Sequence, residues 1–388
     1  MIDKLSLTPD FKLGFLGGGQ LARMSAIEAF KLGIQVAMFG SAKDKEPLEW
    51  MTPHVFKGSF SDTDAIKSFV DFCDIVTLEN EFIDSSILKE ISKTSETPLY
   101  PSAQTFGKID TKLKEKRCFE AAGIPVTPYS LINEDNTLDV FGDEYGWPYI
   151  LKSSKGGYDG YGNKTIHDST EARKLYDDLG GNEGREIIAE AFVPFSMELA
   201  IQVARNAQGN IEVFPCCETI QENHICKVVV APARMNSKLH ARIKELAIAA
   251  IEAIDGIGIY AFEFFLTKNE EILLNESAPR PHNSGHYTIE GCVGSQFENH
   301  VRAVLNLPLS STEMRKPAAV MINLLGTHNG TASTENHTKL LNSSDGHLHL
   351  YGKNSSKVGR KMGHFTLLGY DQTEVLNRAL SLTSDFRI

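Results

Sequence analysis

The sequence has few features of secreted, membrane or nucleic-acid-binding proteins. Only six of its 388 residues are cysteines and none are spaced CxxC, which argues against a disulfide framework or a zinc knuckle. No apolar run approaches the roughly 18 residues of a membrane span, and no basic segment followed by an apolar stretch opens the chain. Acids outnumber bases by 50 to 39, whereas a general nucleic-acid binder needs clustered Lys and Arg. We expect a reduced, cytoplasmic protein that binds neither membranes nor nucleic acid.

The order of strand and helix signals predicts an α/β protein of two to three domains. Residues 13–40 show an apolar strand, a glycine turn, an amphipathic helix and a second apolar strand. The alternation continues to about residue 105, which is typical of a parallel sheet. A further amphipathic helix is predicted over 239–254, and short strand-like runs after about residue 308 indicate a small β-rich part.

The first glycine turn, Gly17-x-Gly19-x-x-Ala22, matches the dinucleotide-binding fingerprint. Such a turn presents a helix N-terminus, where unpaired N–H groups favour an anion. NAD would also need an acid at the end of the second strand, but that strand ends in Phe39-Gly40-Ser41. The pattern therefore disfavours NAD and leaves open a phosphate- or substrate-facing loop and a plain tight turn.

A second glycine-rich segment follows Lys152, which ends an apolar strand. Four glycines fall within seven residues, at 156, 157, 160 and 162. Their backbone N–H groups could surround phosphate oxygens with Lys152 as a compact charge beside them. The spacing is not that of a Walker A loop, and a solvated hairpin is the alternative.

Two glutamates in apolar strands are the strongest local sign of a metal site. Residues 259–266 and 271–277 look like the strands of one hairpin, and a turn centred between Asn269 and Glu270 would place Glu263 opposite Glu276. Like charges directly opposite each other destabilise a ladder. A cation would relieve the repulsion, and Mg²⁺ is the usual one where phosphates are handled. The alternative is two independently solvated glutamates.

Two further segments carry candidate anion-binding residues. Arg280 stands between two prolines that fix its backbone, within a polar run over 275–286. The segment 351–364 contains five basic side chains and no acid, so it is either an anion site or a solvated basic face. Its basic residues are Lys353, Lys357, Arg360, Lys361 and His364. A strand–turn–strand path could bring Lys353 and Arg360 together on a phosphate.

Three stretches, LGGGQLARM, NESAPRPHNSGHYTIEGCVGSQFENHVRA and YGKNSSKVGRKMGH, closely resemble signatures of the N5-carboxyaminoimidazole ribonucleotide synthetases, which are ATP-grasp enzymes of purine biosynthesis. The resemblance implies an α/β (α+β ATP-grasp) fold in three domains. These are a Rossmann-like preATP-grasp domain over 1–105, an ATP-grasp domain over 106–307 with a mobile lid at about 117–190, and a small β-rich C-terminal domain over 308–388.

The resemblance also implies the reaction. In this family ATP phosphorylates bicarbonate, and the carboxyphosphate, or CO₂ released from it, carboxylates the exocyclic amine of 5-aminoimidazole ribonucleotide. ADP and phosphate leave, Mg²⁺ assists, and no biotin is used. We expect an ATP-dependent ligase that forms a cytoplasmic homodimer. The chain ends at Ile388, so we expect no mutase domain of the kind that follows in some eukaryotes.

Site residues carried over by position fall into overlapping groups. The resemblance implies ATP contacts by Lys112, Lys152, Gly157, Tyr158, Asp159, Gly160, Tyr161, Gly162, Asn163, Glu190, Ala191, Phe192, Val193, Glu198, Gln221, Asn275 and Glu276. It implies ribonucleotide or bicarbonate contacts by Gln20, Glu79, Tyr158, Arg280, His282, Asn283, Lys353, Arg360 and Lys361. Arg280, Asp159 and Lys353 are the implied catalytic residues, and Glu263 and Glu276 the implied magnesium ligands. Within these groups, 190–193 resembles a hinge that reads adenine through backbone groups, and Glu198 matches an acid that holds ribose hydroxyls.

Three other functions compete with this interpretation. Another ATP-grasp ligase, formate-dependent or amino-acid-ligating, would have the same fold. A nucleotide-binding regulatory module without turnover is disfavoured because a binder has no need of the paired acids Glu263 and Glu276. A dehydrogenase is disfavoured by the missing ribose acid after the second strand.

Overall fold

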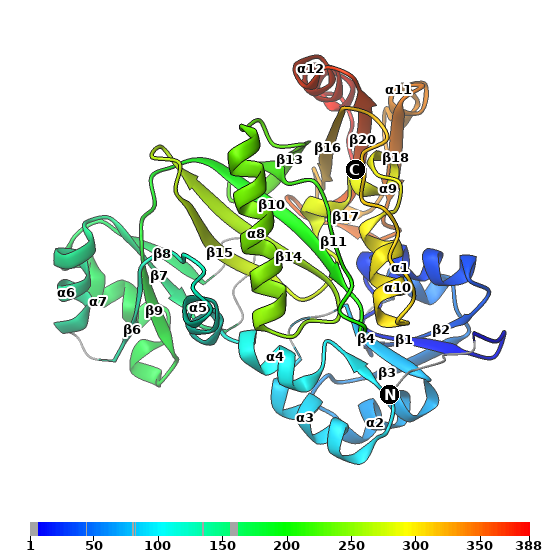
Figure 1. Ribbon diagram of the computed structural model, residues 1–388, viewed down its shortest axis with the longest axis horizontal. Coiled ribbons are helices and arrows are strands. Elements are labelled where there is room, and N and C mark those ends of the chain that lie inside the picture. Colours follow the sequence, from blue (N-terminus) through cyan, green and yellow to red (C-terminus); the bar gives the residue numbers. More distant parts are fainter. Residues whose placement is uncertain (1–6, 44, 80, 82, 134–135, 156–161) are drawn as a thin grey trace.

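Three large β-sheets organise the chain, and they occupy different parts of Figure 1. In this computed structural model the described residues are 7–388, apart from 44, 80, 82, 134–135 and 156–161. The N-terminal sheet lies at the lower right of the view and a small antiparallel sheet at the left. The largest sheet runs between them toward the C-terminal helix at the top. No helix within the described residues is long and apolar enough to cross a membrane.

The N-terminal sheet is parallel, with the order β3-β2-β1-β4-β5. Its strands are β1 (Lys12–Leu16), β2 (Gln35–Ser41), β3 (His54–Gly58), β4 (Ile75–Leu78) and β5 (Leu99–Tyr100). Its helical segments are α1 (Gln20–Lys31), η1 (Pro47–Trp50), α2 (Thr63–Phe72), α3 (Ser85–Thr94) and α4 (Ala103–Ile109). Apolar side chains of α1 pack on one face together with α10 (Gln296–Val304), and those of α2, α3 and α4 cover the other. The parallel sheet that the alternation predicts is thus confirmed, and its two covered faces agree with the Rossmann-like domain that the resemblance implies.

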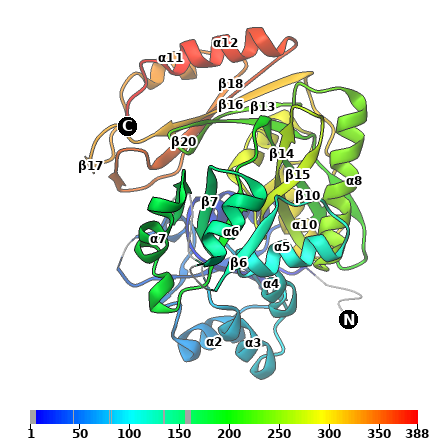
Figure 2. The ribbon, with the colours of Figure 1, turned by 90° about the vertical axis from the view of Figure 1, so that its left-hand side faces the viewer.

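The small sheet is antiparallel, with the order β6-β9-β7-β8. Its strands are β6 (Tyr129–Ile132), β7 (Tyr149–Ser153), β8 (Asn163–Ile166) and β9 (Ile187–Ala191), and its helices are α6 (Asn136–Tyr145) and α7 (Ser169–Asp178), with a short turn η2 at Gly181–Glu183. Tyr149, Leu151, Ile187 and Ala189 pack against these helices, which face the viewer in Figure 2. Because side chains alternate along a strand, Lys152 and Glu190 lie on the opposite face.

The largest sheet has the path β15-β14-β10-β12-β13-β16-β20-β18, with β11 paired to β10. Its strands are β10 (Phe195–Arg205), β11 (Ile211–Val213), β12 (Cys217–Glu222), β13 (Ile225–Ala231), β14 (Gly258–Thr267), β15 (Ile272–Ala278), β16 (Ala318–Leu325), β18 (Gly346–Leu350) and β20 (Lys361–Gly369). The helices α5 (Lys112–Ala121) and α8 (Ser237–Ala253) pack against its first strands. The predicted helix over 239–254 is thus confirmed as α8.

Alternation along β10 and β14 separates a core face from a polar face. Leu199, Ile201 and Val203 of β10, with Phe262 and Phe264 of β14, pack under α8. The intervening positions of both strands face the other side of the sheet. That second face carries Glu198, Gln202 and Glu263. The alternation that packs apolar residues against α8 therefore places these three polar side chains on the opposite face of the sheet.

The C-terminal part is β-rich as expected, but its strands continue the largest sheet instead of forming a separate one. Strand β16 pairs with β13, with Val228 opposite Ile322. The reason is that β16 is buried on both faces and is therefore an interior strand of the sheet. The other C-terminal elements are β17 (Gly330–Thr331), α11 (His337–Leu341), β19 (Ser355–Ser356) and α12 (Gln372–Thr383). Helix α12 has no counterpart in the sequence prediction, and with α11 it lies above β16 and β18 in Figure 2.

Candidate functional site

Glu263 and Glu276 lie directly opposite each other on β14 and β15, as predicted. The predicted pairing register next to the turn was wrong by one residue. Leu266 pairs with Ile272, and this register alone would place Glu263 opposite Asn275. A bulge between Glu263 and Phe264 shifts the ladder by one residue and restores the acid pair.

One lysine balances this acid pair. Lys112 Nζ lies 3.0 Å from Glu276 Oε2. The Lys112 charge lowers the pKa of Glu276 to about 2. Burial and the neighbouring Glu276 charge raise the pKa of Glu263 to about 8. Two carboxylates with one close cation leave a deficit of positive charge between them.

The deficit fits a divalent cation that is shared with phosphates. Among the described residues no group of three or more His, Cys, Asp or Glu side chains could hold a metal ion. Mg²⁺ usually binds through one or two carboxylates together with substrate phosphates, so a protein-only cage is not needed. The donor set of Glu263 and Glu276 meets that requirement.

Lys152 and Glu190 meet on the inner face of the small sheet. Lys152 Nζ donates to Glu190 Oε2 at 2.9 Å and lies 3.5 Å from Asn275 Oδ1. Thr127 also donates to Glu190 Oε2, at 3.0 Å. The sequence interpretation used only the backbone of Glu190, whereas the structure places its side chain beside the implied phosphate cation.

Lys116 is a further charged residue that the sequence analysis missed. It is fully buried, donates to Thr127, and lies 3.3 Å from Glu190 Oε2. Burial alone would raise the pKa of Glu190, but Lys152 and Lys116 together lower it to about 2. The available signal was helical spacing, because Lys116 follows Lys112 by one turn of α5 and shares its face.

The implied ribose and adenine residues lie on β10 and β12 and around the end of β9. Glu198 on β10 is hydrogen-bonded to Gln221 on β12. Burial raises the pKa of Glu198 above its ordinary value. Ala191 ends β9, and Phe192 beyond it is 49% exposed. Val193 follows, and its carbonyl accepts from Phe195 N at 2.9 Å.

Only part of the second glycine segment lies within the described residues. Asn163 pairs with Lys152 across β7 and β8, and Gly162 O accepts from Ser153 N at 3.0 Å. The predicted site residues Gly157, Tyr158, Asp159, Gly160 and Tyr161 lie outside the described residues.

The polar run after β15 crosses to the N-terminal sheet. Arg280 forms an ion pair with Glu81, and its guanidinium also donates to Pro281 O at 3.1 Å. Burial would lower the pKa of Arg280, but the Glu81 charge raises it. Burial raises the pKa of Glu79, and the charge of Arg280 offsets part of that rise. The run thus joins the acid pair to the start of α1.

Two carboxylates occupy the first glycine turn. The backbones of Gly19 and Leu21 hydrogen-bond Glu79, and that of Gly18 hydrogen-bonds Glu46. A Cβ on Gly19 would lie 2.2 Å from Glu79 Oε1, so only glycine permits this approach. The carboxylates already occupy this helix start, which disfavours a phosphate there. Gln20, the other residue implied here, is the first residue of α1.

Glu46 was not found from sequence, because it stands in the irregular segment between β2 and η1. One of its carboxylate oxygens, Oε2, is buried without a partner among the described residues. Burial and the nearby Glu79 charge raise the pKa of Glu46 to about 7. Glu46 and Glu79 therefore form a second acid pair, beside α1.

The basic C-terminal segment is divided between the cleft and its own loop. Lys353 Nζ donates to Lys361 O at 2.8 Å. The positive charge of Lys353 also offsets part of the rise in the pKa of Glu79. The positive charge of Lys361 favours a lower pKa at both Glu263 and His282. Arg360 is exposed and donates to Ser355 O at 2.9 Å. In the structure Lys353 and Arg360 therefore bond different parts of their own segment.

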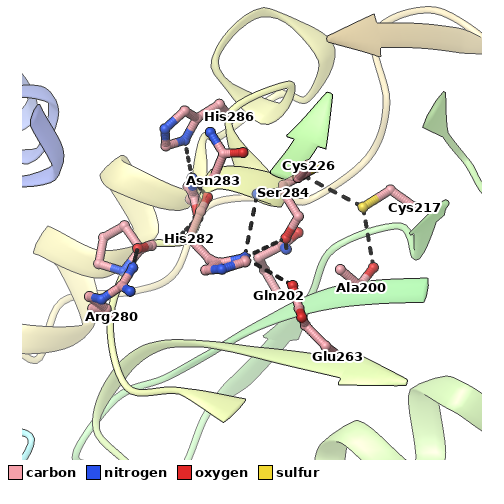
Figure 3. Close-up of polar contacts among 12 residues, drawn as sticks. Ala200, Gln202, Cys217, Cys226, Glu263, Arg280, His282, Asn283, Ser284 and His286 are labelled. Carbon is pink, nitrogen blue, oxygen red and sulfur yellow. Dashed lines mark hydrogen bonds and ion pairs between the residues drawn. The ribbon is translucent and has the colours of Figure 1, made fainter. Parts of the chain in front are cut away.

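His282 and Asn283 tie the polar run to the largest sheet (Figure 3). His282 Nδ1 lies 3.7 Å from Glu263 Oε1. Burial, Arg280 and Lys361 lower the pKa of His282 to about 3. The side-chain amides of Asn283 and Asn323 bond each other reciprocally at 2.8 and 2.6 Å, and Asn323 belongs to β16. The C-terminal strands therefore help to hold the site.

Comparison with known families agrees with this architecture. The model described as ribonucleotide synthetase preATP-grasp domain matches residues 11–109, and the ATP-grasp domain model matches 117–297. The phosphoribosylaminoimidazole carboxylase C-terminal domain model matches 319–378. The small sheet contributes Lys152, and the largest sheet contributes the paired acids Glu263 and Glu276. Together with these features, the domain matches define an ATP-grasp protein.

Individual relatives identify the family within the ATP-grasp proteins. The N5-carboxyaminoimidazole ribonucleotide synthase of Bacillus subtilis is 35% identical over 373 residues, which cover 96% of this chain and 95% of the relative. This chain belongs to the N5-carboxyaminoimidazole ribonucleotide synthase family of ATP-grasp ligases. The phosphoribosylaminoimidazole carboxylase of Ogataea methanolica is 38% identical over 376 residues, which cover 94% of this chain and 68% of that protein. The chain therefore spans about two thirds of that longer relative.

Solved structures show the same arrangement. The N5-carboxyaminoimidazole synthase from Aspergillus clavatus, in complex with ADP and 5-aminoimidazole ribonucleotide, superposes with a TM-score of 0.86 at 33% identity. The superposition covers 97% of this chain and 98% of that chain.

Proposed function

We propose that this chain uses ATP and bicarbonate to convert 5-aminoimidazole ribonucleotide into N5-carboxyaminoimidazole ribonucleotide, with release of ADP and phosphate, in purine biosynthesis. The observation that carries this proposal is the opposed pair Glu263 and Glu276, with Lys112 and Lys152 on one side and Arg280 on the other. Such a cleft can hold a polyphosphate and present its terminal phosphoryl group to a second anionic substrate. The Aspergillus relative, which is a complex with ADP and the same ribonucleotide, supports the choice of substrate.

On the nucleotide side, we assign the phosphates to Lys112 and Lys152. Glu198 and Gln221 would hold the ribose hydroxyls, and the backbone at 190–193 would read the adenine. Glu263 and Glu276 would hold Mg²⁺, which neutralises charge on the phosphates during phosphoryl transfer. Asn275 stays assigned to the nucleotide, because it lies beside both Lys152 and Glu276. Gly162 and Asn163 stay assigned with the loop that precedes them.

On the substrate side, Arg280 would bind and orient bicarbonate through its planar guanidinium. Lys353 and Lys361 would supply positive charge for the ribonucleotide, and Arg360 would grip its 5′-phosphate after leaving Ser355. Glu79 at the start of α1 would accept hydrogen bonds from the ribonucleotide. His282 and Asn283 complete this side, together with Gln20, Tyr158 and Asp159.

We further propose the organisation that goes with this activity. The domain boundaries at about 105 and 307, the lid at about 117–190, the homodimer and the cytoplasmic location remain predictions. The domain matches at 11–109, 117–297 and 319–378 support the order of the domains.

The direct test is ADP release measured with ATP and Mg²⁺ while one further substrate is omitted at a time. Full turnover should require both 5-aminoimidazole ribonucleotide and bicarbonate. Formate in place of bicarbonate should give no product, and turnover with formate would identify a different ATP-grasp ligase. ATP binding without any turnover would identify a regulatory module.

A further inference from the structure

A chain of buried hydrogen bonds ends on the imidazole of His282 (Figure 3). Gln202 Nε2, on β10, donates to Ser284 Oγ at 2.9 Å. Ser284 Oγ lies 2.8 Å from His282 Nδ1, and Ser284 N donates to the same Nδ1 at 3.4 Å. Gln202 and Ser284 are fully buried, whereas the His282 side chain is 23% exposed. The ring therefore has Nδ1 anchored in the protein, while part of the side chain stays exposed.

The order of donors assigns the ring proton. A serine hydroxyl carries one proton, and because Ser284 Oγ accepts from Gln202 it can donate that proton to His282 Nδ1. The Ser284 N–H is a second donor to the same nitrogen. A nitrogen that accepts hydrogen bonds carries a lone pair, so a neutral ring holds its proton on Nε2. The described residues give Nε2 no hydrogen-bond partner.

The surroundings indicate what an Nε2–H group would meet. Arg280 precedes His282 by two residues, and the charges of Arg280 and Lys361 act on the ring against the opposing charge of Glu276. Glu263 Oε1 lies 3.7 Å from Nδ1, on the anchored edge of the ring. These cations favour an anion in the adjacent cleft. A general base would instead need a lone pair on Nε2, which the hydrogen bonds at Nδ1 exclude.

We propose that Ser284 and Gln202 are positioning residues that hold His282 in the Nε2–H tautomer, so that His282 donates a hydrogen bond to an anionic oxygen of the carboxyl or phosphoryl group in the cleft. The identity of that anion rests on the proposed function, but the tautomer does not. Tautomer and turnover are therefore measured separately.

The tautomer is measured by nitrogen NMR on the chain labelled with ¹⁵N-histidine. A protonated ring nitrogen and a lone-pair nitrogen resonate in separate regions of the spectrum, and the His282 signals are those missing from His282→Gln. We expect Nδ1 in the lone-pair region and Nε2 in the N–H region. The opposite pattern would mean that the Gln202 carbonyl faces Ser284 and the proton lies on Nδ1, which overturns the proposal.

A hydroxyl-deletion variant tests the positioning role. Ser284→Ala removes the donor to Nδ1, so its spectrum should shift toward a mixture of tautomers and kcat should fall about tenfold, the loss of one hydrogen bond. The matched control is Thr105→Val, because Thr105, on helix α4 of the N-terminal part, is also a buried hydroxyl and donates to Asp255 O at 3.1 Å. The control should leave the tautomer unchanged and kcat within about twofold. Equal losses of kcat in both variants would show a merely structural role and refute the positioning.

Two substitutions of the ring itself separate a donor from a base. His282→Gln keeps an N–H donor, whereas His282→Met has none. A donor role requires clearly higher kcat in His282→Gln than in His282→Met, and equal losses would refute it. If the wild-type chain does not turn over 5-aminoimidazole ribonucleotide, the proposed function fails while the NMR result still decides the tautomer.

Discussion

Replacing Glu276 by Gln tests the assignment of the acid pair most directly, because the structure separates its effect on catalysis from its effect on folding. In the resting protein, the ion pair with Lys112 spans 3.0 Å and the Glu276 side chain is 43% exposed. At the dielectric constant of water, Coulomb's law gives about 1.4 kcal/mol of attraction at that distance. Glu263, whose pKa is raised to about 8, is mostly protonated near neutral pH and adds little repulsion.

Ordering two side chains offsets much of that attraction in a partly exposed pair, so Glu276→Gln should change the free energy of unfolding by less than about 1 kcal/mol. Catalysis should respond differently. If Glu276 shares Mg²⁺ with the phosphates, loss of its charge removes stabilisation that grows as the phosphoryl group transfers, and kcat should fall by about 100-fold or more. The Mg²⁺ concentration for half-maximal activity should rise as well.

The assay is ADP release with both substrates present, titrated with Mg²⁺, alongside urea unfolding of the same preparations. Glu218→Gln is the matched control. Glu218 also pairs with a cation, Arg234, at 2.7 and 2.8 Å, but it lies opposite Leu199 and so faces the α8 side of the sheet. Near-wild-type turnover in Glu276→Gln would refute the metal assignment. A loss of several kcal/mol in stability would instead make Glu276 a structural residue.

Three further outcomes are expected. Lys116→Met should raise the ATP KM and cost about 1–3 kcal/mol in urea unfolding, because Glu190 loses its ion pair with Lys116 and retains the one with Lys152. An unchanged ATP KM would contradict this. Arg360→Ala should raise KM for the ribonucleotide about tenfold or more and leave that for ATP unchanged, whereas no change in either would make Arg360 a surface residue bound to Ser355. Folding raises the pKa of Glu46 from 4.5 to about 7. Between these two values the folded chain keeps a proton that the unfolded chain releases, so the free energy of unfolding should fall as pH rises from about 4.5 to about 7. Glu46→Gln should remove about 1 kcal/mol of that fall in urea titrations at pH 5 and 8, and identical pH profiles would refute the assignment.

Local pattern was sufficient for the elements whose hydrogen bonds are short in sequence. The strand–turn–helix–strand at 13–40 and helix α8 follow from periodicity alone. The hairpin was located correctly as well, and its acid pair was reached although the pairing register next to the turn was one residue off. Bulges of this kind depend on packing across the sheet, so spacing along one strand does not report them.

Long-range placement was not predictable in the same way. Lys112 and Glu276 are 164 residues apart, and no window of sequence relates them. Their joint assignment came from the family resemblance. The joining of β16 to β13 was missed because a strand buried on both faces shows no alternation from which a partner could be read. Lys116 and Glu46 were missed because a buried charge is recognised by its partners, and those partners come from other elements.

These missed residues explain how the cleft can hold several lysines before any nucleotide arrives. Lys112, Lys116 and Lys152 would repel one another, but Glu190 and Glu276, both with pKa values near 2, stay ionised beside them. Burial disfavours the charged form of Lys116 and lowers its pKa, so Glu190 is needed to keep it charged. A polyphosphate would pair with Lys112, and Glu276, released from Lys112, would be one of the residues that hold Mg²⁺. Lys112 and Glu276 would then each exchange their mutual ion pair for a partner in the substrate.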